Sequence, residues 1–283
     1  MFKNQNYCDG KYESLDVRFT KACDNACSFC IDKQTGAPSF GATDVDKMIQ
    51  STLSSGIKKV FILGGEPLLQ PFKVLQYIKG IRSFVDEIYI TTSLPFQIIK
   101  YQSICDEIFS LINGLYISIQ STSWRINNQI LRARSQHNRL DILKSLNLKM
   151  ADKIRVNLNL VKGGIDSKEI LLHALHQLED IGCLHIKINE LQNNTNIYVS
   201  FEEIMGIKMK NPYSVGCNTQ ITLLPYTDRM KIFLKRSCFI VESSRKANMM
   251  DLFKAIYRRW FAKPTKNKHR VFYENGQIEK DWI

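Results

Sequence analysis

The chain has 283 residues, of which 44% are hydrophobic, so it can bury a large core, and its composition excludes a disordered protein. Its first residues lack the apolar stretch of a signal peptide, and nowhere do roughly 18 apolar residues follow one another, as a spanning helix requires. We therefore expect a cytoplasmic protein that does not enter a membrane. Its eight cysteines should be free thiols, because disulfide scaffolds are typical of short secreted chains.

The net charge of +12 is distributed unevenly along the chain. Residues 229–270 contain 13 Lys or Arg and only two acids, a local net charge of +11 that leaves +1 for the remainder. Any electrostatic attraction of a partner therefore concerns this C-terminal segment.

Short apolar strands alternate with helices through the first two thirds of the chain. We expect six strands, at residues 15–20, 58–63, 86–92, 114–120, 154–161 and 183–191. Helices should begin at Thr43 or Asp44 and end at Gly56, begin near Pro71, begin near Pro95, and end near Gly182 after a capping box of Asp166 and Glu169. Because parallel neighbours need helical crossovers, the alternation predicts an α/β fold, a partial (β/α)6 TIM-like barrel of parallel strands.

After residue 191 the alternation stops at a polar break. We expect an N-terminal extension at 1–13, a core barrel at 14–191, a linker at 192–215 and a small basic α+β module at 216–283 that closes the open side of the barrel. The module should contain strands within 219–226 and 230–241, a helix at 249–263 and a hairpin at 271–279.

Three cysteines, Cys23, Cys27 and Cys30, follow the first strand at C-x3-C-x2-C spacing. A cubane iron-sulfur cluster needs four ligands, so a site with three thiolates leaves one iron open for another molecule. The alternative is a structural zinc site completed by Cys8 or a histidine.

The context of these cysteines resembles the radical S-adenosylmethionine (SAM) superfamily over about residues 15–191. Phe29 precedes the last cysteine, and Gly64, Gly65, Glu66 and Pro67 form a GGEP loop after the second strand. In pattern the chain is most similar to the branch of the molybdenum-cofactor GTP-cyclising enzymes and peptide maturases, through the segments ILGGEPLL, ITTSL, ISIQS and VNLNLVKGG.

The resemblance implies a [4Fe-4S] cluster on the three cysteines, with SAM on the open iron. It implies SAM contacts for Phe29, Gly64, Gly65, Glu66, Pro67, Thr91, Ser118, Gln120, Asn157 and Asn159, with the Glu66 carboxylate near the SAM ammonium. One electron from an external flavodoxin- or ferredoxin-like donor would cleave SAM to a 5'-deoxyadenosyl radical, which abstracts hydrogen from the substrate.

This chain departs from the branch pattern in several places. Gln120 replaces an Asp of the family pattern and Ser93 replaces an Asn. After residue 191 only Cys217 and Cys238 occur, too few for an auxiliary four-cysteine cluster.

The basic C-terminal segment is the sequence feature that bears on the substrate. Arg258, Arg259 and Lys263 lie beside Trp260, a mixture that suits phosphate binding plus stacking, although a solvated basic surface is the alternative. We expect an anionic substrate of nucleotide or nucleic-acid type. The other hypotheses are a peptide-modifying maturase and a zinc- or cluster-stabilised nucleic-acid-binding protein without catalysis.

Overall fold

The computed structural model describes residues 14–30, 32, 41–191, 196–207, 219–222, 229–236, 269–273 and 278–279. The expected N-terminal extension, part of the expected linker and the expected helix at 249–263 lie outside these residues. The expected boundaries between core, linker and module remain predictions.

Ten strands of the described residues form one sheet, in the order β10-β9-β1-β2-β3-β4-β5-β6-β8-β7. Their bounds are β1 (Ser14–Arg18), β2 (Lys59–Leu63), β3 (Glu87–Thr92), β4 (Gly114–Ile119), β5 (Ile154–Leu160), β6 (His185–Glu190), β7 (Thr219–Thr222), β8 (Lys231–Arg236), β9 (His269–Phe272) and β10 (Ile278–Glu279). From β9 through β1 to β6 and β8 all neighbours are parallel, whereas β10 and β7 pair antiparallel at the two edges. The six expected strands and the α/β class are confirmed.

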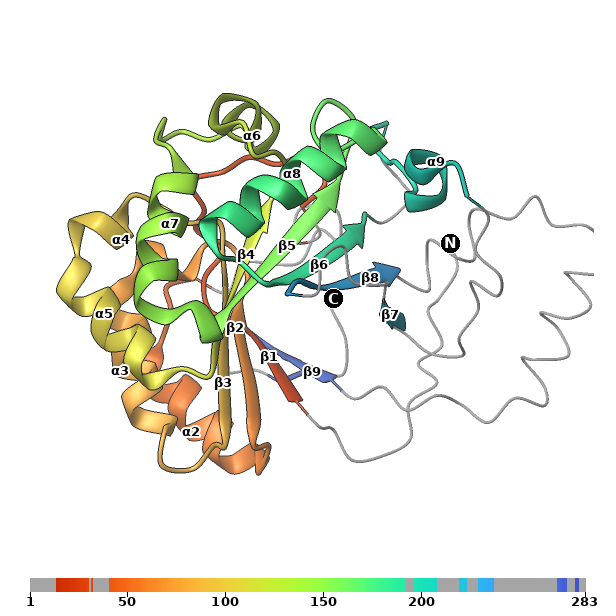
Figure 1. Ribbon diagram of the computed structural model, residues 1–283. Helices are drawn as coiled ribbons and strands as arrows, with labels where there is room; N and C mark the ends of the chain where they lie inside the picture. The colour runs from red at the N-terminus through yellow and green to blue at the C-terminus, as the bar shows by residue number, and fades with distance from the viewer. Residues whose placement is uncertain are drawn as a thin grey trace, which may run out of the picture.

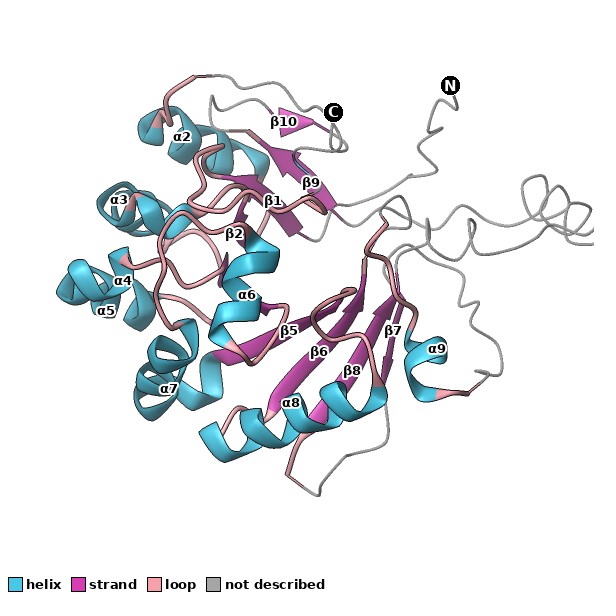
Figure 2. Cartoon of the chain, turned by 90° about the horizontal axis from the view of Figure 1, so that it is seen from above, coloured by secondary structure: helices cyan, strands magenta, loops and turns pink. Residues whose placement is uncertain are grey.

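The sheet is curved like part of a barrel wall, and helices cover its outer side (Figures 1 and 2). The helices are α2 (Val45–Ser55), α3 (Pro71–Ile81), α4 (Gln97–Lys100), α5 (Gln102–Leu111), α6 (Trp124–Leu131), α7 (Arg139–Met150), α8 (Lys168–Ile181) and α9 (Phe201–Met205), with short 3-10 turns η1 (Pro67–Leu69) and η2 (Ala151–Lys153). Within the described part of the chain, none of these helices has the length and apolarity needed to cross a membrane.

Local capping explains where the helices begin and end. The Asp44 side chain accepts from the backbone N–H of Lys47 at the start of α2, and Gly56 ends that helix at φ 67°. At α8 the expectation is wrong, because the N-cap is Ser167, which accepts from Ile170 N at 3.3 Å. The Asp166 carboxylate instead accepts from Gly163 N at 2.7 Å, in the preceding turn.

Alternation along the strands separates a helix-covered face from a concave face. On β6, Ile186 and Ile188 are buried in the same core cluster as Leu175 and Leu178 of α8. Lys187, between the two isoleucines, therefore faces the concave side. The same alternation on β4 and β5 sends polar side chains to the concave face, which is the barrel interior of the sequence-based prediction.

Two C-terminal strands extend this parallel sheet beyond the expected six. β8 lies beside β6, and β9 lies beside β1, with Leu15 opposite Arg270. The antiparallel pairs β7–β8 and β9–β10 correspond to the strands and the hairpin expected in the module. Segments that follow the six expected strands thus form both flanks of the sheet.

Candidate cofactor site

The cysteine loop follows β1, at the edge where the parallel strands end. Cys23, Cys27 and Cys30 are free thiols, and each is partly exposed. The loop contacts the end of α6. The N–H of Ala26 donates to the carbonyl oxygen of Leu131 at 2.8 Å, and the Cys27 thiol lies 3.6 Å from the same oxygen.

The electrostatic surroundings of Cys23 favour the neutral thiol. The pKa of Cys23 is raised to about 11: burial raises it most, the N–H of Asn25 lowers it, and the Glu66, Asp24 and Cys30 side chains also raise it. A metal displaces the proton of a thiol ligand, so cluster binding at Cys23 would release the thiol proton of this residue.

The GGEP loop follows β2 and lies against the start of the cysteine loop. Gly64 and Gly65 have φ values of 79° and 53°, in the left-handed region that favours glycine. A Cβ on Gly65 would collide with the carbonyl oxygens of Thr20 and Ala22, and the N–H of Glu66 donates to Ala22 O at 2.8 Å. Glycine at these two positions therefore allows the two loops to touch through their backbones.

Glu66 is 1% exposed, and its carboxylate accepts four hydrogen bonds from the protein. Oε1 accepts from Leu68 N at 3.2 Å and from Thr92 Oγ1 at 2.9 Å. Oε2 accepts from both N and Oγ of Ser93, each at 2.7 Å. Burial raises the pKa of Glu66, while the Ser93 and Thr92 donors lower it. Glu66 thus joins the loop after β2 to the end of β3, and its contact with SAM remains a prediction.

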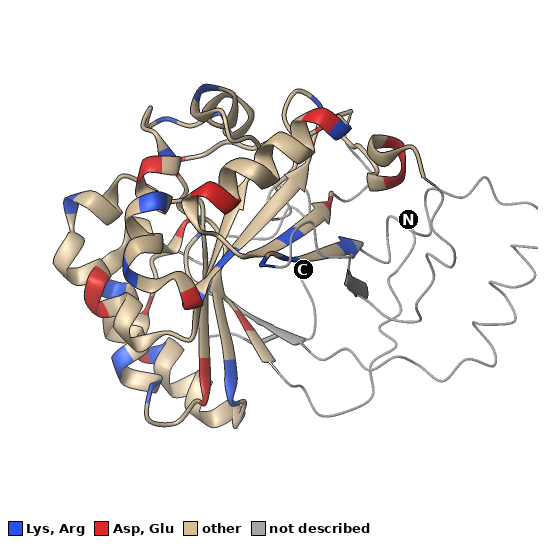
Figure 3. Ribbon diagram, viewed as in Figure 1, with Lys and Arg blue, Asp and Glu red and all other residues tan. Residues whose placement is uncertain are grey.

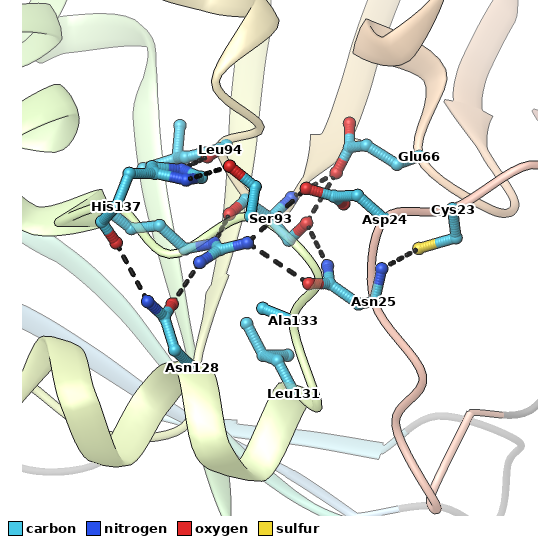
Figure 4. Close-up of polar contacts among 12 residues, drawn as sticks. Cys23, Asp24, Asn25, Glu66, Ser93, Leu94, Asn128, Leu131, Ala133 and His137 are labelled. Atoms are coloured by element: carbon cyan, nitrogen blue, oxygen red, sulfur yellow. Dashed lines mark hydrogen bonds and ion pairs between the residues drawn. The ribbon is translucent and has the colours of Figure 1, made fainter.

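A network of buried polar residues that the sequence did not predict lies between α7 and the cysteine loop (Figure 4). Arg139, 2% exposed, donates to Ser93 O at 2.8 Å and to Asn25 Oδ1 at 3.2 Å, and it also contacts Asn128. Asn25 in turn donates to Ser93 Oγ at 2.7 Å.

The Asp24 carboxylate lies 3.6 Å from the Arg139 guanidinium, inside the C-x3-C interval. The network therefore places one buried cation beside the loop that carries the three thiols. Its only signal in the sequence is the polar pair Asp24-Asn25 inside the motif, because Arg139 lies more than 100 residues away.

The polar residues expected at the ends of β3, β4 and β5 are brought to the same edge. Thr91, Ser118, Asn157 and Asn159 alternate with helix-covered residues and so face the concave side. Ser118 and Asn157 are direct neighbours in the register of β4 and β5.

Two amide oxygens at this edge have no hydrogen-bond partner among the described residues. They are Oε1 of Gln120, a residue 1% exposed, and Oδ1 of Asn157, a residue 8% exposed. Buried acceptors are normally satisfied, so this pair indicates a place for a ligand that donates hydrogen bonds. SAM has suitable donors in its ammonium group, its ribose hydroxyls and its adenine amine.

The donor set fits an iron-sulfur cluster more closely than a single metal ion. In the described part of the chain, no three His, Cys, Asp or Glu side chains converge on one metal position. Cubane ligands bind different irons and need not converge on one point, and three partly exposed thiols on one loop supply three such ligands. The zinc alternative needs a fourth ligand, and Cys8 lies outside the described residues.

The sequence-predicted site residues thus fall into two groups. The three cysteines, the GGEP loop and the polar strand-end residues share one edge of the sheet, and Phe29 lies in the cysteine loop, partly exposed. Arg258, Arg259 and Lys263, expected to bind substrate, lie outside the described residues. Cys105 and Cys183, at 0% and 1% exposure, are core residues.

Comparisons with curated proteins give two similar relatives. The chain is 22% identical over 208 residues to the GTP 3',8-cyclase of Limosilactobacillus fermentum, covering 69% of this chain and 61% of that protein. It is 26% identical over 210 residues to the GTP 3',8-cyclase of Lactiplantibacillus plantarum, covering 71% and 60%. The matches thus span about three fifths of the length of these relatives.

Among solved structures the fold is similar to Streptococcus suis SuiB. The SAM-bound form has a TM-score of 0.62 at 14% identity, covering 96% of this chain and 60% of that chain. The form bound to the precursor peptide SuiA has a TM-score of 0.59 at 14% identity, with the same coverage. At this identity the similarity concerns the fold alone.

The radical SAM superfamily model matches residues 17–176. The match includes the cysteine loop, the GGEP loop and strands β2 to β5, and it covers more than half of the chain. This chain therefore belongs to the radical SAM superfamily.

Proposed function

We propose that this chain is a radical SAM enzyme that acts on an anionic substrate of nucleotide or nucleic-acid type. Superfamily membership implies SAM and a [4Fe-4S] cluster. In this proposal Cys23, Cys27 and Cys30 hold the cluster. Phe29, the GGEP loop and Thr91, Ser118, Gln120, Asn157 and Asn159 hold SAM, and an external flavodoxin- or ferredoxin-like protein supplies the electron.

The observation that carries the proposal is that two unsatisfied acceptors share a sheet edge with the three thiols. Gln120 Oε1 and Asn157 Oδ1 are buried without a partner among the described residues. A donor-rich ligand bound at this edge would satisfy both oxygens and lie beside the cysteine loop.

When bound, the cluster and SAM would supply reductive cleavage of the sulfonium to a 5'-deoxyadenosyl radical. The residues of the chain position these groups and exclude water. Glu66 holds the GGEP backbone against the end of β3 through its three hydrogen bonds from Thr92 and Ser93, which leaves the backbone groups of the loop to line the SAM site. The Arg139 network holds the cysteine loop in place, and within it the Asp24 carboxylate offsets the charge of the guanidinium.

The substrate class is supported by two features. The curated relatives are named as cyclases of GTP, an anionic nucleotide. The chain also carries its excess positive charge in residues 229–270, including the proposed substrate residues Arg258, Arg259 and Lys263. Peptide modification is the second candidate, favoured by the fold similarity to SuiB.

The SAM chemistry is tested by anaerobic reconstitution with iron and sulfide. We expect about four irons per chain, and 5'-deoxyadenosine from SAM and dithionite. Cys27→Ala should abolish the product, because it leaves two thiolates for the cluster. Cys105→Ala, which removes a buried thiol of α5, is the matched control and should retain activity. An unchanged yield in Cys27→Ala would contradict the proposal, as would bound zinc in place of iron.

The substrate class is tested by binding of GTP, RNA oligonucleotides and peptides to the reconstituted protein. Binding of a nucleotide or nucleic acid should weaken as salt rises and on neutralising Arg258, Arg259 and Lys263. Salt-insensitive binding of a peptide alone would favour the maturase candidate.

A further inference from the structure

Two lysines on the concave face of the sheet have no role in the SAM site described above. Lys187 lies on β6 and Lys235 on β8, two neighbouring parallel strands. Lys187 is in register with Asn157 of β5, and Lys235 is in register with Asn189 of β6. Both lysines therefore lie at the level of the polar strand ends.

Both side chains point into the concave side. On β8, as on β6, the helix-covered positions are apolar and buried: Ile232 is 3% exposed and Leu234 is 0% exposed. Lys235 follows Leu234 and therefore faces the opposite, concave side. The Lys187 Nζ lies 5.2 Å from the centroid of the Tyr116 ring, two strands away on β4. Lys235 is influenced by the Asp16 carboxylate of β1, on the other flank of the sheet.

Lys187 and Lys235 belong to a group of basic residues on β5, β6 and β8. Figure 3 marks the Lys and Arg positions on these strands. Arg155 and Lys231 lie at the opposite end of these strands, with His185 between them. Burial lowers the pKa of His185, and the two cations lower it as well. Two other cations of the concave face are ion-paired: Lys59 binds Glu87 at 2.7 Å, and Arg18 binds Asp32 at 2.9 Å.

Neither ammonium group has a hydrogen-bond acceptor or ion-pair partner within the described residues. Next to them, Asn189 donates to Asn159 Oδ1 at 3.1 Å, which makes a polar row along the same wall. Burial and Lys235 lower the pKa of Lys187 to about 8, and burial lowers that of Lys235. The Asp16 carboxylate opposes the effect of burial on Lys235, whereas no acid is among the groups that shift the pKa of Lys187. Two like charges close together cost stability, and a bound anion would lower this cost.

We propose that Lys187 and Lys235 form the binding subsite for an anionic group of the substrate, a phosphate or a carboxylate, inside the barrel. The inference rests on the proposed function and adds to it the place where the substrate charge is held. Tyr116 provides an aromatic wall beside the ammonium of Lys187, and the Asn159–Asn189 row provides amide donors. The row also connects the subsite to Asn157 and hence to the SAM site, so the bound substrate lies next to SAM.

Anion titration of the full-length, reconstituted protein tests the subsite, with pyrophosphate and citrate as probes for phosphate and carboxylate. Calorimetry is run with and without SAM. We expect Lys187→Met and Lys235→Met each to weaken binding of the preferred probe at least tenfold and the double variant to abolish it. Lys187→Arg should retain most of the affinity. Lys144→Met removes an exposed charge of α7 and should leave it unchanged.

Folding and SAM binding serve as internal controls. Both Met variants should remain folded, and Lys187→Met should melt at or above the temperature of the wild type, because it removes a partly buried cation that has no acidic partner among the described residues. The affinity for SAM should change less than twofold.

Three outcomes overturn the inference: wild type binds neither probe, both Met variants bind the probe as tightly as wild type, or they lose SAM instead. The last would assign the lysines to the SAM carboxylate. Formation of 5'-deoxyadenosine is measured separately. A wild type that forms this product but binds neither probe would contradict the proposed subsite and leave the proposed function standing.

Discussion

Buried charges in this chain are stabilised in different ways at the residue scale. The carboxylate of Glu66 accepts four hydrogen bonds, and the guanidinium of Arg18 combines an ion pair with the face of the Tyr273 ring at 4.3 Å. The ammonium of Lys187 lies over the Tyr116 ring and has no ion-pair partner among the described residues. The charges of Glu66 and Arg18 are thus satisfied by contacts within the protein, whereas the charge of Lys187 favours binding of an anionic ligand.

We therefore expect the free energies of unfolding of the wild type and of Lys187→Met to differ by an amount that depends on pH. The Lys187 pKa is lowered from 10.5 to about 8, which corresponds to roughly 3 kcal/mol when the side chain is charged in the fold. Between these values the unfolded chain binds more protons, so this residue makes stability rise with pH. Below pH 8 the Met variant should be more stable by up to that amount, and above pH 10.5 the advantage should vanish.

Urea unfolding of both proteins at pH 7 and pH 10.5 measures this difference. Comparing the two proteins cancels the titration of the tyrosines. Equal unfolding free energies at pH 7 would show that Lys187 is well solvated.

At the element scale, the loops that follow β1 and β2 depend on each other. Gly65 lies against the backbone of the cysteine loop, and Glu66 binds the end of β3. A change in one loop should therefore disturb the others.

Gly65→Ala tests this dependence, with Gly206→Ala as the matched control. Both glycines have φ near 60°, but a Cβ at Gly206 meets nothing within 4 Å, whereas at Gly65 it meets two carbonyl oxygens. We expect about 1 kcal/mol of destabilisation for Gly206→Ala and about 3 kcal/mol or more for Gly65→Ala. Urea unfolding measures the stability, and iron content after reconstitution should fall only in Gly65→Ala. Equal costs would mean that the close approach is unimportant.

The sequence predicted most elements, and its errors have local physical reasons. Spacing of apolar residues and the caps Asp44 and Gly56 determined α2, because both signals lie within the element. The cap of α8 was assigned to Asp166 although Ser167 performs it, because both residues are good N-caps and only the turn geometry distinguishes them. The helix expected near Pro95 is divided into α4 and α5 at Tyr101.

At the scale of the whole molecule, the C-terminal strands are part of the main sheet. β9 pairs with β1, and Tyr273, which follows it, is fully buried over the Arg18 guanidinium. Arg18 immediately precedes the segment that leads to the cysteines. The C-terminal end of the chain thus supports the strand that carries the cofactor site.

Tyr273→Ala should therefore destabilise the barrel from a position far from it in sequence. Loss of a buried ring that also covers a buried cation should cost roughly 3 kcal/mol or more. Tyr273→Phe, which keeps the ring, should lose less than half as much. Urea unfolding followed by circular dichroism measures both variants, and an unaffected Tyr273→Ala would show that β9 contributes little.

The sequence by itself determined the chemistry-bearing motifs and the alternation of six strands with helices. Cys23, Cys27, Cys30 and the GGEP loop are recognisable because each motif needs particular residues at short, fixed spacing. The tertiary structure decided what surrounds them: Arg139 behind the cysteine loop, β9 beside β1, and Lys187 beside Lys235 on the concave face. These contacts join residues far apart in the chain, and the cost or benefit of a buried charge depends on its neighbours in space, which no local pattern records.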